Sequence, residues 1–209
     1  MEIQKKGKEI IIRHVLKKNE VYRISESRKF QTLTISKKPK KVTGVSSYCE
    51  DGKHVLFIDW DTCALWVVLA DFKRIQEEYA LPPGYLFASK KEEVDENGDV
   101  VGNFHLICLK KFYPKEIYEI ITKTHADVNY MSMPLRNKYR GWVLRISPKG
   151  KRDRPHFSQI VGENINLNER VSEAHFEFLK KIYPDIPNIK FTNFDGLDAI
   201  KINFYETLN

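Results

Sequence analysis

The sequence predicts a mixed α+β fold, with strands and helices in a split βαβ arrangement over one sheet and the helices on one face of it. Two stretches with apolar residues at helical spacing, residues 65–79 and 114–126, are separated by short apolar runs that predict strands. The chain has 209 residues, of which 42% are hydrophobic, so it can bury a substantial core. We expect one domain, with a basic, β-rich part over residues 1–50, a core over 51–155 and a C-terminal helix and strands over 156–209.

The first half of the chain begins with short β-prone runs that Lys, Asn, Pro and Gly interrupt. Residues 54–60 form a nearly continuous apolar run, which is typical of a strand buried on both faces. The helix over 65–79 follows, with the dipeptide Asp61-Thr62 as its candidate cap and the prolines and glycine of residues 81–84 at its end. The early runs predict strands over residues 9–15, 20–24, 30–36 and 42–48.

The second half alternates in the same way. Residues 85–89 and 101–109 predict the two strands of a hairpin, whose turn contains Asn97 and Gly98. Pro114 begins the second helix. The remaining predictions are strands over residues 128–131 and 141–147, a helix after the candidate cap Asn168, and strands over 188–194 and 198–205.

Composition and local features exclude several classes of protein. The three cysteines lack CxxC spacing, which argues against a disulfide framework and against a zinc ribbon. The start of the chain is charged, its apolar run is too short for a signal-peptide core, and no apolar stretch reaches the length of a membrane span. We therefore expect a cytoplasmic protein that needs no membrane.

Positive charge is concentrated in two blocks. The first fifty residues carry a surplus of eight charges, and residues 136–154 contain eight Lys and Arg with Asp153 as the single acid. The whole chain carries +7, so the remainder is acidic. Basic blocks around an acidic middle fit carboxylates that bind metal and flanks that bind phosphates. A solvated lysine-rich surface explains the first block equally well, whereas the second, which interleaves Arg with Tyr139 and Trp142, favours contact with a polyanion.

Asp59 and Asp61 form the candidate chemical centre. They end the predicted buried strand, and side chains at i and i+2 point to one face of a strand, so we expect the carboxylates to stand side by side. Like charges that close raise each other's pKa unless a cation neutralises them, and oxygen ligands suit Mg²⁺ or Mn²⁺. Taken alone, the pair also has a simple structural reading, with Asp61 as a helix cap and Asp59 in a turn.

Three further polar residues stand out near this pair. His105 interrupts an apolar strand that is expected to share a sheet with Asp59 and Asp61. Arg145 lies within a short apolar strand, where an unpaired guanidinium is costly to bury, so we expect it to pair with a carboxylate or to face a phosphate. Asp127, at the end of the second helix, is a candidate third carboxylate.

In their order and spacing these residues resemble the archaeo-eukaryotic primase superfamily, which includes the primase-polymerases of plasmids and viruses. Its members carry hhhDhD, s-x-H and hD motifs on an RRM-like sheet, followed by a strand with Arg and then a Lys. The matching segments here are residues 56–61, 103–105 and 126–127, followed by Arg145 and Lys149. The resemblance covers roughly residues 50–155 and departs from the family at the asparagine of the second motif, where relatives have a small serine.

The resemblance implies a template-dependent nucleotidyl transferase, that is, the catalytic core of a DNA primase or polymerase. Asp59, Asp61 and Asp127 would hold two divalent ions, Mg²⁺ or Mn²⁺, for attack of a hydroxyl on a nucleoside triphosphate. The triphosphate would contact Ser89, His105, Arg145, Ser147 and Lys149. The DNA template and primer would contact Arg136, Lys138, Arg140, Lys151, Arg152 and Arg154. A helicase or a primase accessory subunit encoded elsewhere is an expected partner, because the sequence has no Walker motif.

Two other functions stay open. A nucleic-acid-binding replication protein without catalysis, or an inactive relative of the primases, would share the topology but would leave Asp59 and Asp61 unexplained. A metal-dependent nuclease also needs clustered acids between basic flanks, but it usually has a Glu or Lys near the acidic pair, and none follows Asp61 before Lys73. We rank the polymerase first, the binding module second and the nuclease third.

Overall fold

The computed structural model describes residues 42–89, 92–134, 141–149 and 152–195 with their side chains, and some strand and helix segments outside these ranges by their backbone alone. The chain divides into two compact units, residues 1–41 with 206–209, and residues 42–205. The larger unit is a mixed α+β structure and contains the acidic pair. None of the helices in the described ranges is long and apolar enough to cross a membrane.

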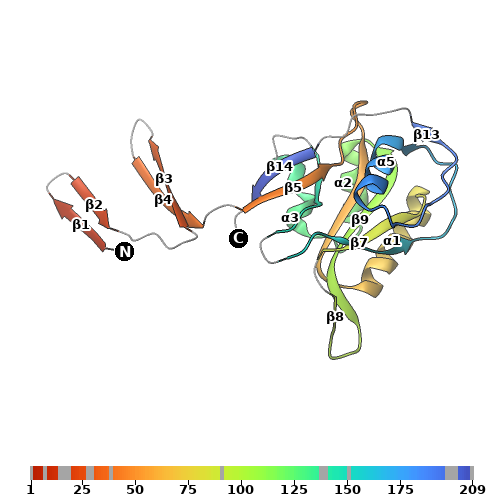
Figure 1. Ribbon diagram of the computed structural model, residues 1–209, viewed down its shortest axis with the longest axis horizontal. Coiled ribbons are helices and arrows are strands. Elements are labelled where there is room, and N and C mark those ends of the chain that lie inside the picture. Colours follow the sequence, from red (N-terminus) through yellow and green to blue (C-terminus); the bar gives the residue numbers. More distant parts are fainter. Residues whose placement is uncertain are drawn as a thin grey trace. The chain divides into compact units, whose positions relative to one another are not determined.

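The smaller unit contains two antiparallel β-hairpins (Figure 1). They confirm the strands predicted near residues 9–15, 20–24 and 30–36, whereas the first strand was not predicted. Most residues of the first basic block fall in this unit, where side chains lie outside the described part of the chain. The hairpins are formed by β1 (Glu2–Lys6) with β2 (Glu9–Arg13), and by β3 (Glu20–Glu26) with β4 (Gln31–Lys37).

A seven-stranded mixed sheet forms the centre of the larger unit. Its long strand β9 (Val100–Phe112) pairs antiparallel with β6 (His54–Ala64) along one edge and with β7 (Gly84–Ala88) along the other. Strands β6 and β7 therefore run parallel, as in a split βαβ unit. β11 (His156–Val161), which was not predicted, adds to β7. The sheet is completed by β8 (Glu93–Val94), β12 (Val171–Ser172) and β13 (Phe194–Asp195).

Helices cover both faces of this sheet (Figure 1). The Nε1 of Trp60 in β6 donates a hydrogen bond to Asp71 of α1 (Leu65–Tyr79), whereas the ring of Phe57 meets His175 of α5 (Glu173–Ile182) at 6.0 Å between centroids. Residues 57 and 60 lie three apart in a regular stretch of β6, so their side chains project from opposite faces. The prediction that the helices lie on one face is therefore wrong.

The first two helices begin where the sequence predicts, but their caps and ends differ in part. Helix α1 has the predicted bounds, but its N-cap is Ala64, because β6 continues through Asp61 and Thr62. The cap predicted at those two residues is therefore wrong. Helix α2 (Pro114–Thr122) begins at the predicted proline and ends four residues before the predicted end, because the chain turns at residues 123–125.

Two predictions in the C-terminal half fail at helix caps. Residues 128–131 form the short helix α3 (Val128–Met131) instead of a strand, because the side chain of Asp127 accepts a hydrogen bond from the N–H of Tyr130 at 2.7 Å and so caps a helix there. Helix α5 is capped by Ser172 and not by Asn168. A further short helix, α4 (Met133–Arg136), follows α3.

The strand that carries Arg145 belongs to a separate, three-stranded sheet. β10 (Val143–Arg145) pairs antiparallel with β5 (Lys40–Ser46), which also pairs with β14 (Ile202–Thr207). The strands predicted over 42–48, 141–147 and 198–205 are thus confirmed with shifted or shorter bounds. The strand predicted over 188–194 is wrong except at its last residue, where the two-residue strand β13 begins.

All three cysteines are free thiols. Cys49 and Cys108 are fully buried in the core, and Cys63 at the end of β6 is half-buried. No disulfide joins any two of these three residues in the structure.

Gly162 provides a test of the packing between β11 and α1. Its φ is +86°, and a Cβ added there would lie 2.5 Å from Cε1 of buried Phe72 and 2.7 Å from the side-chain amide of Gln76. We expect Gly162→Ala to lower the free energy of unfolding by about 2–4 kcal/mol, because it combines backbone strain with overpacking. Chemical denaturation measures this loss. Gly98→Ala is the matched control, since its φ is +84° but nothing lies within 4 Å of the added Cβ. Equal losses in the two variants would contradict the packing argument.

Candidate functional site

The pairing of β6 with β9 brings two carboxylates against two polar side chains. Asp59 stands directly opposite His105, with 3.4 Å between Oδ1 of Asp59 and Nε2 of His105. The side-chain amide of Asn103 donates a hydrogen bond to Oδ1 of Asp61. Asn103 and His105 are two residues apart in β9 and so share one face of the sheet. Both carboxylates therefore lie on that face, as the i, i+2 spacing predicts.

A β-bulge aims Asp61 at Asn103. The register shifts between Trp60 and Cys63, so two residues of β6 stand opposite Asn103. The second of them, Thr62, has a φ of +50°, which is unusual for a β-branched residue, and its N–H donates to Oδ1 of Asn103 at 3.3 Å. Asn103 thus joins the backbone of the bulge to the carboxylate of Asp61. Asn103 therefore has a structural role in this chain.

Asp59 is in an environment that disfavours its charge. Burial raises the pKa of Asp59 well above its usual range, and the charges of Asp61 and Asp127 raise it further, while Arg145 and Lys149 act in the opposite direction. The Oδ1 atom of Asp59 is buried and accepts no hydrogen bond from the residues that the structure describes. A bound cation would stabilise a buried carboxylate oxygen that lies beside two other acids.

His105 is neutral at physiological pH. Burial lowers the pKa of His105 to about 3, and the positive charge of Arg145 contributes in the same direction. Its approach to Asp59 is therefore a contact between an imidazole and a carboxyl group, without a full charge on the ring.

Asp127 reaches the site through the backbone. Its N–H donates to the carbonyl of Asp59 at 2.8 Å, which attaches the start of α3 to β6. One oxygen of its carboxylate caps α3, as described above. Across the described ranges of the chain, no group of three or more His, Cys, Asp or Glu side chains is arranged to hold a metal ion. The charges of Asp61 and Asp127 thus act on Asp59, but the three carboxylates are not arranged around a common metal position.

Arg145 is buried, and main-chain oxygens satisfy much of its hydrogen-bonding capacity. Its guanidinium donates to the carbonyls of Ser147 at 2.6 Å, Asp153 at 2.8 Å and Ser89 at 2.9 Å. These acceptors are carbonyls, where the sequence predicted a carboxylate or a phosphate. They hold the positive charge within electrostatic range of Asp59.

The other three residues predicted to contact phosphate, Ser147, Ser89 and Lys149, differ in the hydrogen bonds that they already make. The Ser147 hydroxyl accepts a hydrogen bond from the N–H of Thr43 at 2.8 Å, so it links the segment after β10 to β5. The N–H of Ser89 donates to the carbonyl of Asn103 at 2.7 Å, so β9 lies between Ser89 and the acidic pair of β6. Lys149 is partly buried, and backbone hydrogen bonds of 2.9 and 3.1 Å join it to Arg152 across a tight turn.

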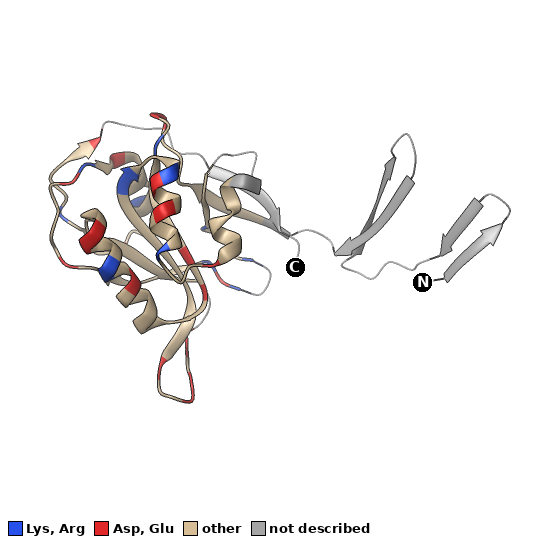
Figure 2. Cartoon of the chain, turned by 180° about the vertical axis from the view of Figure 1, so that it is seen from behind, with Lys and Arg blue, Asp and Glu red and all other residues tan. Residues whose placement is uncertain are grey.

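The second basic block is only partly visible. The side chains of Arg136, Lys138, Arg140, Lys151 and Tyr139 lie outside the described residues. Arg152 and Arg154 are exposed, whereas Trp142 is buried in the core and is unable to stack on a base. Acidic residues gather on the hairpin that leads from β8 to β9, which carries red segments in Figure 2. A polyanion would therefore approach the larger unit away from that hairpin.

Comparison with known proteins gives no relative. No protein-family model, no curated protein and no solved structure matches this chain.

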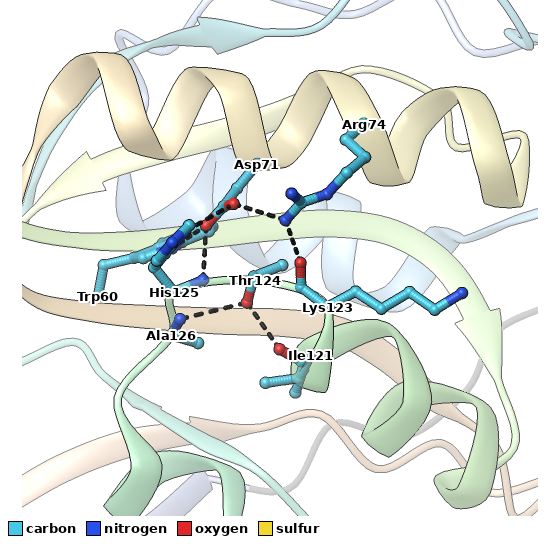
Figure 3. Close-up of polar contacts among 8 residues, drawn as sticks. All are labelled: Trp60, Asp71, Arg74, Ile121, Lys123, Thr124, His125 and Ala126. Carbon is cyan, nitrogen blue, oxygen red and sulfur yellow. Dashed lines mark hydrogen bonds and ion pairs between the residues drawn. The ribbon is translucent and has the colours of Figure 1, made fainter.

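Asp71, a buried residue of α1, connects the two segments that carry the acids (Figure 3). Its Oδ2 accepts hydrogen bonds from Nε1 of Trp60 at 3.1 Å and from the N–H of His125 at 2.7 Å. Its Oδ1 lies 3.0 Å from Nδ1 of His125 and 2.8 Å from the guanidinium of Arg74. Trp60 stands between the acidic pair, and His125 precedes Asp127 by two residues. Sequence reasoning missed Asp71, although an acid within the apolar stripe of a helix is a signal for such a role.

The electrostatic strain at Asp59 predicts a gain in stability when its charge is removed. A carboxyl group whose pKa is raised on folding binds its proton more tightly in the folded state, so it lowers stability progressively as pH rises above about 4. We expect Asp59→Asn to be more stable than the wild type at pH 7 by about 1 kcal/mol, or about 2–4 °C in Tm, with the difference vanishing near pH 3. Calorimetry of the metal-free protein across this pH range measures it, and a variant less stable at pH 7 would contradict it.

The connection through Asp71 predicts a large loss of stability. Asp71→Ala leaves the buried Nε1 of Trp60 and the partly buried N–H of His125 without their acceptor, so we expect the free energy of unfolding to fall by about 3 kcal/mol. Urea denaturation measures this change. Asp99→Ala is the matched control, because Asp99 accepts a hydrogen bond of the same 3.1 Å length from Nε1 of Trp66 at the surface. Its expected cost is below about 0.5 kcal/mol, and a similar small cost at Asp71 would contradict the role assigned to it.

Proposed function

We propose that this chain is a template-dependent nucleotidyl transferase of the primase-polymerase type, built on an RRM-like split βαβ sheet. One observation carries the proposal. Asp59 and Asp61 share a sheet face with His105 and Asn103, and the charges of Asp127, Arg145 and Lys149 all act on Asp59. Acids beside fixed cations are what transfer of a phosphoryl-linked group requires, because negative charge must be both bound and neutralised.

The acidic residues are suited to bind a divalent cation that enters the site together with a nucleoside triphosphate. The buried Oδ1 of Asp59 lacks a hydrogen bond from the described residues, and the pKa of Asp59 is raised in part by neighbouring acids, so an ion there would relieve both costs. Mg²⁺ is usually bound by one or two carboxylates together with substrate phosphates and water. Asp59 and Asp61 would supply those carboxylates. Asp127 would help to bind a second ion through the carboxylate oxygen that does not cap α3.

Within this proposal, residues of the chain bind and orient the triphosphate. The neutral imidazole of His105 offers one N–H to a phosphate oxygen without repelling a metal ion. Arg145 supplies a positive charge whose position is fixed by three carbonyls. Lys149, whose charge also acts on Asp59, approaches from the turn after β10. Together they would neutralise charge that develops on the leaving group.

The proposed reaction joins a hydroxyl to a nucleotide. The 3′-oxygen of a primer, or of a first nucleotide, forms a bond to the α-phosphorus, the bond from that phosphorus to the bridging oxygen breaks, pyrophosphate leaves and the hydroxyl proton passes to water. Mg²⁺ or Mn²⁺ supplies activation of the hydroxyl and neutralisation of the triphosphate when bound. Arg152 and Arg154, which are exposed, would contact the DNA template and primer with the other basic residues of the second block. A helicase or primase accessory subunit would supply unwinding.

Loss of either carboxylate of the pair is the direct test of the proposed function. With Mn²⁺ or Mg²⁺, a primed template and both ribo- and deoxynucleotides, we expect incorporation by the wild type and a loss of about 10³-fold in Asp59→Asn and in Asp61→Asn, because each removes a metal ligand. Primer-extension gels measure it, and unchanged or higher Tm values show that the fold persists. Glu96→Gln is the control, because it removes an acidic charge on the exposed hairpin.

A nucleic-acid-binding module without catalysis is the second candidate. It is favoured by the absence, among the described residues, of a three-residue group that is ready to hold a metal, and by the structural bonds that Asp61 and Asp127 already make. An inactive wild type that binds DNA with a strong dependence on salt, on all templates and with both nucleotide types, would establish this alternative over the polymerase.

A further inference from the structure

A groove of about 290 Å³ opens beside the start of β11, on the sheet face that carries Asp59. Phe157 stands directly opposite Phe87 in the neighbouring strand β7, and Phe87 stands opposite His105 in β9, so their side chains share one face. The groove has a largely apolar wall and three polar groups at its rim. The wall consists of Phe157, Tyr183, Pro184 and Ile186, and the polar groups belong to Arg154, His156 and Asp185.

Aromatic rings and one guanidinium define the chemistry of this groove. The ring of Tyr183 packs on Phe87 with 4.7 Å between centroids, and Phe157 meets Phe87 at 6.0 Å. The guanidinium of Arg154 lies over the ring of Tyr183, 5.4 Å from its centroid. Flat aromatic walls with a stacked guanidinium suit a flat, electron-rich ring that is attached to a negative charge.

The groove is aligned with the acidic pair by strand register. Phe157, Phe87, His105 and Asp59 are successive cross-strand neighbours in β11, β7, β9 and β6. Three strand spacings separate the first from the last, or about 14 Å. This is comparable to the length of an extended nucleoside triphosphate, with its base at one end and its γ-phosphate at the other.

Arg145 lies between the groove and the acids. The carbonyl of Asp153, the residue before Arg154, accepts a hydrogen bond from Arg145 at 2.8 Å. Burial raises the pKa of Tyr183, while the charges of Arg154 and Arg145 act in the opposite direction, so both positive charges act on its hydroxyl. A ligand that leaves the groove towards Asp59 therefore passes beside fixed positive charge.

We propose that this groove binds the base of a nucleotide, stacked against Arg154 and the aromatic wall, with its phosphates directed towards His105 and Asp59. The class of ligand rests on the proposed function, but the binding itself requires neither metal nor catalysis. The shared chemistry is a nucleobase joined to a phosphate, whether it belongs to a free nucleotide or to a strand.

Binding of AMP and of ribose 5-phosphate tests this proposal, because the two probes differ only in the base. In isothermal titration calorimetry with EDTA, we expect AMP to bind at least about 10-fold more tightly than ribose 5-phosphate, in keeping with the strength of base stacking. Arg154→Ala should weaken AMP binding about 10-fold. Lys181→Ala removes a positive charge from the exposed last turn of α5, outside the groove, and should leave AMP affinity unchanged.

A second pair of variants separates stacking from folding. Tyr183→Phe keeps the ring and should keep AMP affinity, whereas Tyr183→Leu removes it and should weaken binding, with Tm recorded for both. Equal affinity for the two probes, or AMP affinity that is insensitive to Arg154→Ala, would overturn the proposal.

A short oligothymidylate identifies the source of the base. Arg154-dependent binding of the oligonucleotide in excess of AMP supports the groove as a site for a strand, and the reverse order supports a free nucleotide. The groove and the catalytic proposal fail separately. If the chain binds AMP in an Arg154-dependent way but incorporates no nucleotide, the groove proposal is supported and the polymerase proposal is contradicted. If it incorporates nucleotides but shows no base-dependent binding, the polymerase proposal is supported and the groove proposal is contradicted.

Discussion

The antiparallel register of β6 against β9 is the constraint on which the rest of the larger unit depends. It places Asp59 opposite His105, and it turns the alternate residues, such as Ile58 and Leu106, towards the helix α1 on the opposite face. A slip of one residue would exchange these two sets and would bury both carboxylates under α1. Because α1 and α5 pack on opposite faces, the hydrophobic core on each side resists such a slip.

The carboxylates of Asp59, Asp61 and Asp127 lie close enough to repel one another, and this repulsion does not stabilise the fold. Burial and neighbouring acids oppose the charge of Asp59, and Arg145 and Lys149 offset part of this cost. The structure around the site compensates with specific bonds, notably those of Asp71 to both acidic segments. Proteins commonly retain such locally unfavourable arrangements where function requires them and stabilise them from elsewhere.

Local patterns predicted the elements whose signals are periodic and long. Apolar residues at helical spacing predicted helix α1. The sequence also predicted that the strand with Asp59 and Asp61 and the hairpin strand with His105 belong to one sheet, which is why it placed these residues together. The misses are decided by contacts between distant residues or by single caps. The four residues of α3 are compatible with either a strand or a helix, and the N-cap at Asp127 decides in favour of the helix. Neither the bulge at Thr62 nor the pairing of β10 with β5 has a local signal, because each is set by a partner strand far along the sequence.

The thiols of the chain have a practical consequence for work on the acidic pair. Cys49 and Cys108 are sealed in the core, whereas Cys63 is half-buried and follows Asp61 by two residues at the end of the bulge. Burial and the charge of Asp71 raise the pKa of Cys63, so a thiol-specific reagent will modify it slowly and best in alkaline solution. Cys63 stands opposite Gly102, on the face of the sheet that α1 covers, so a fluorophore or spin label there would report on the bulge and its packing from the side opposite to the carboxylates.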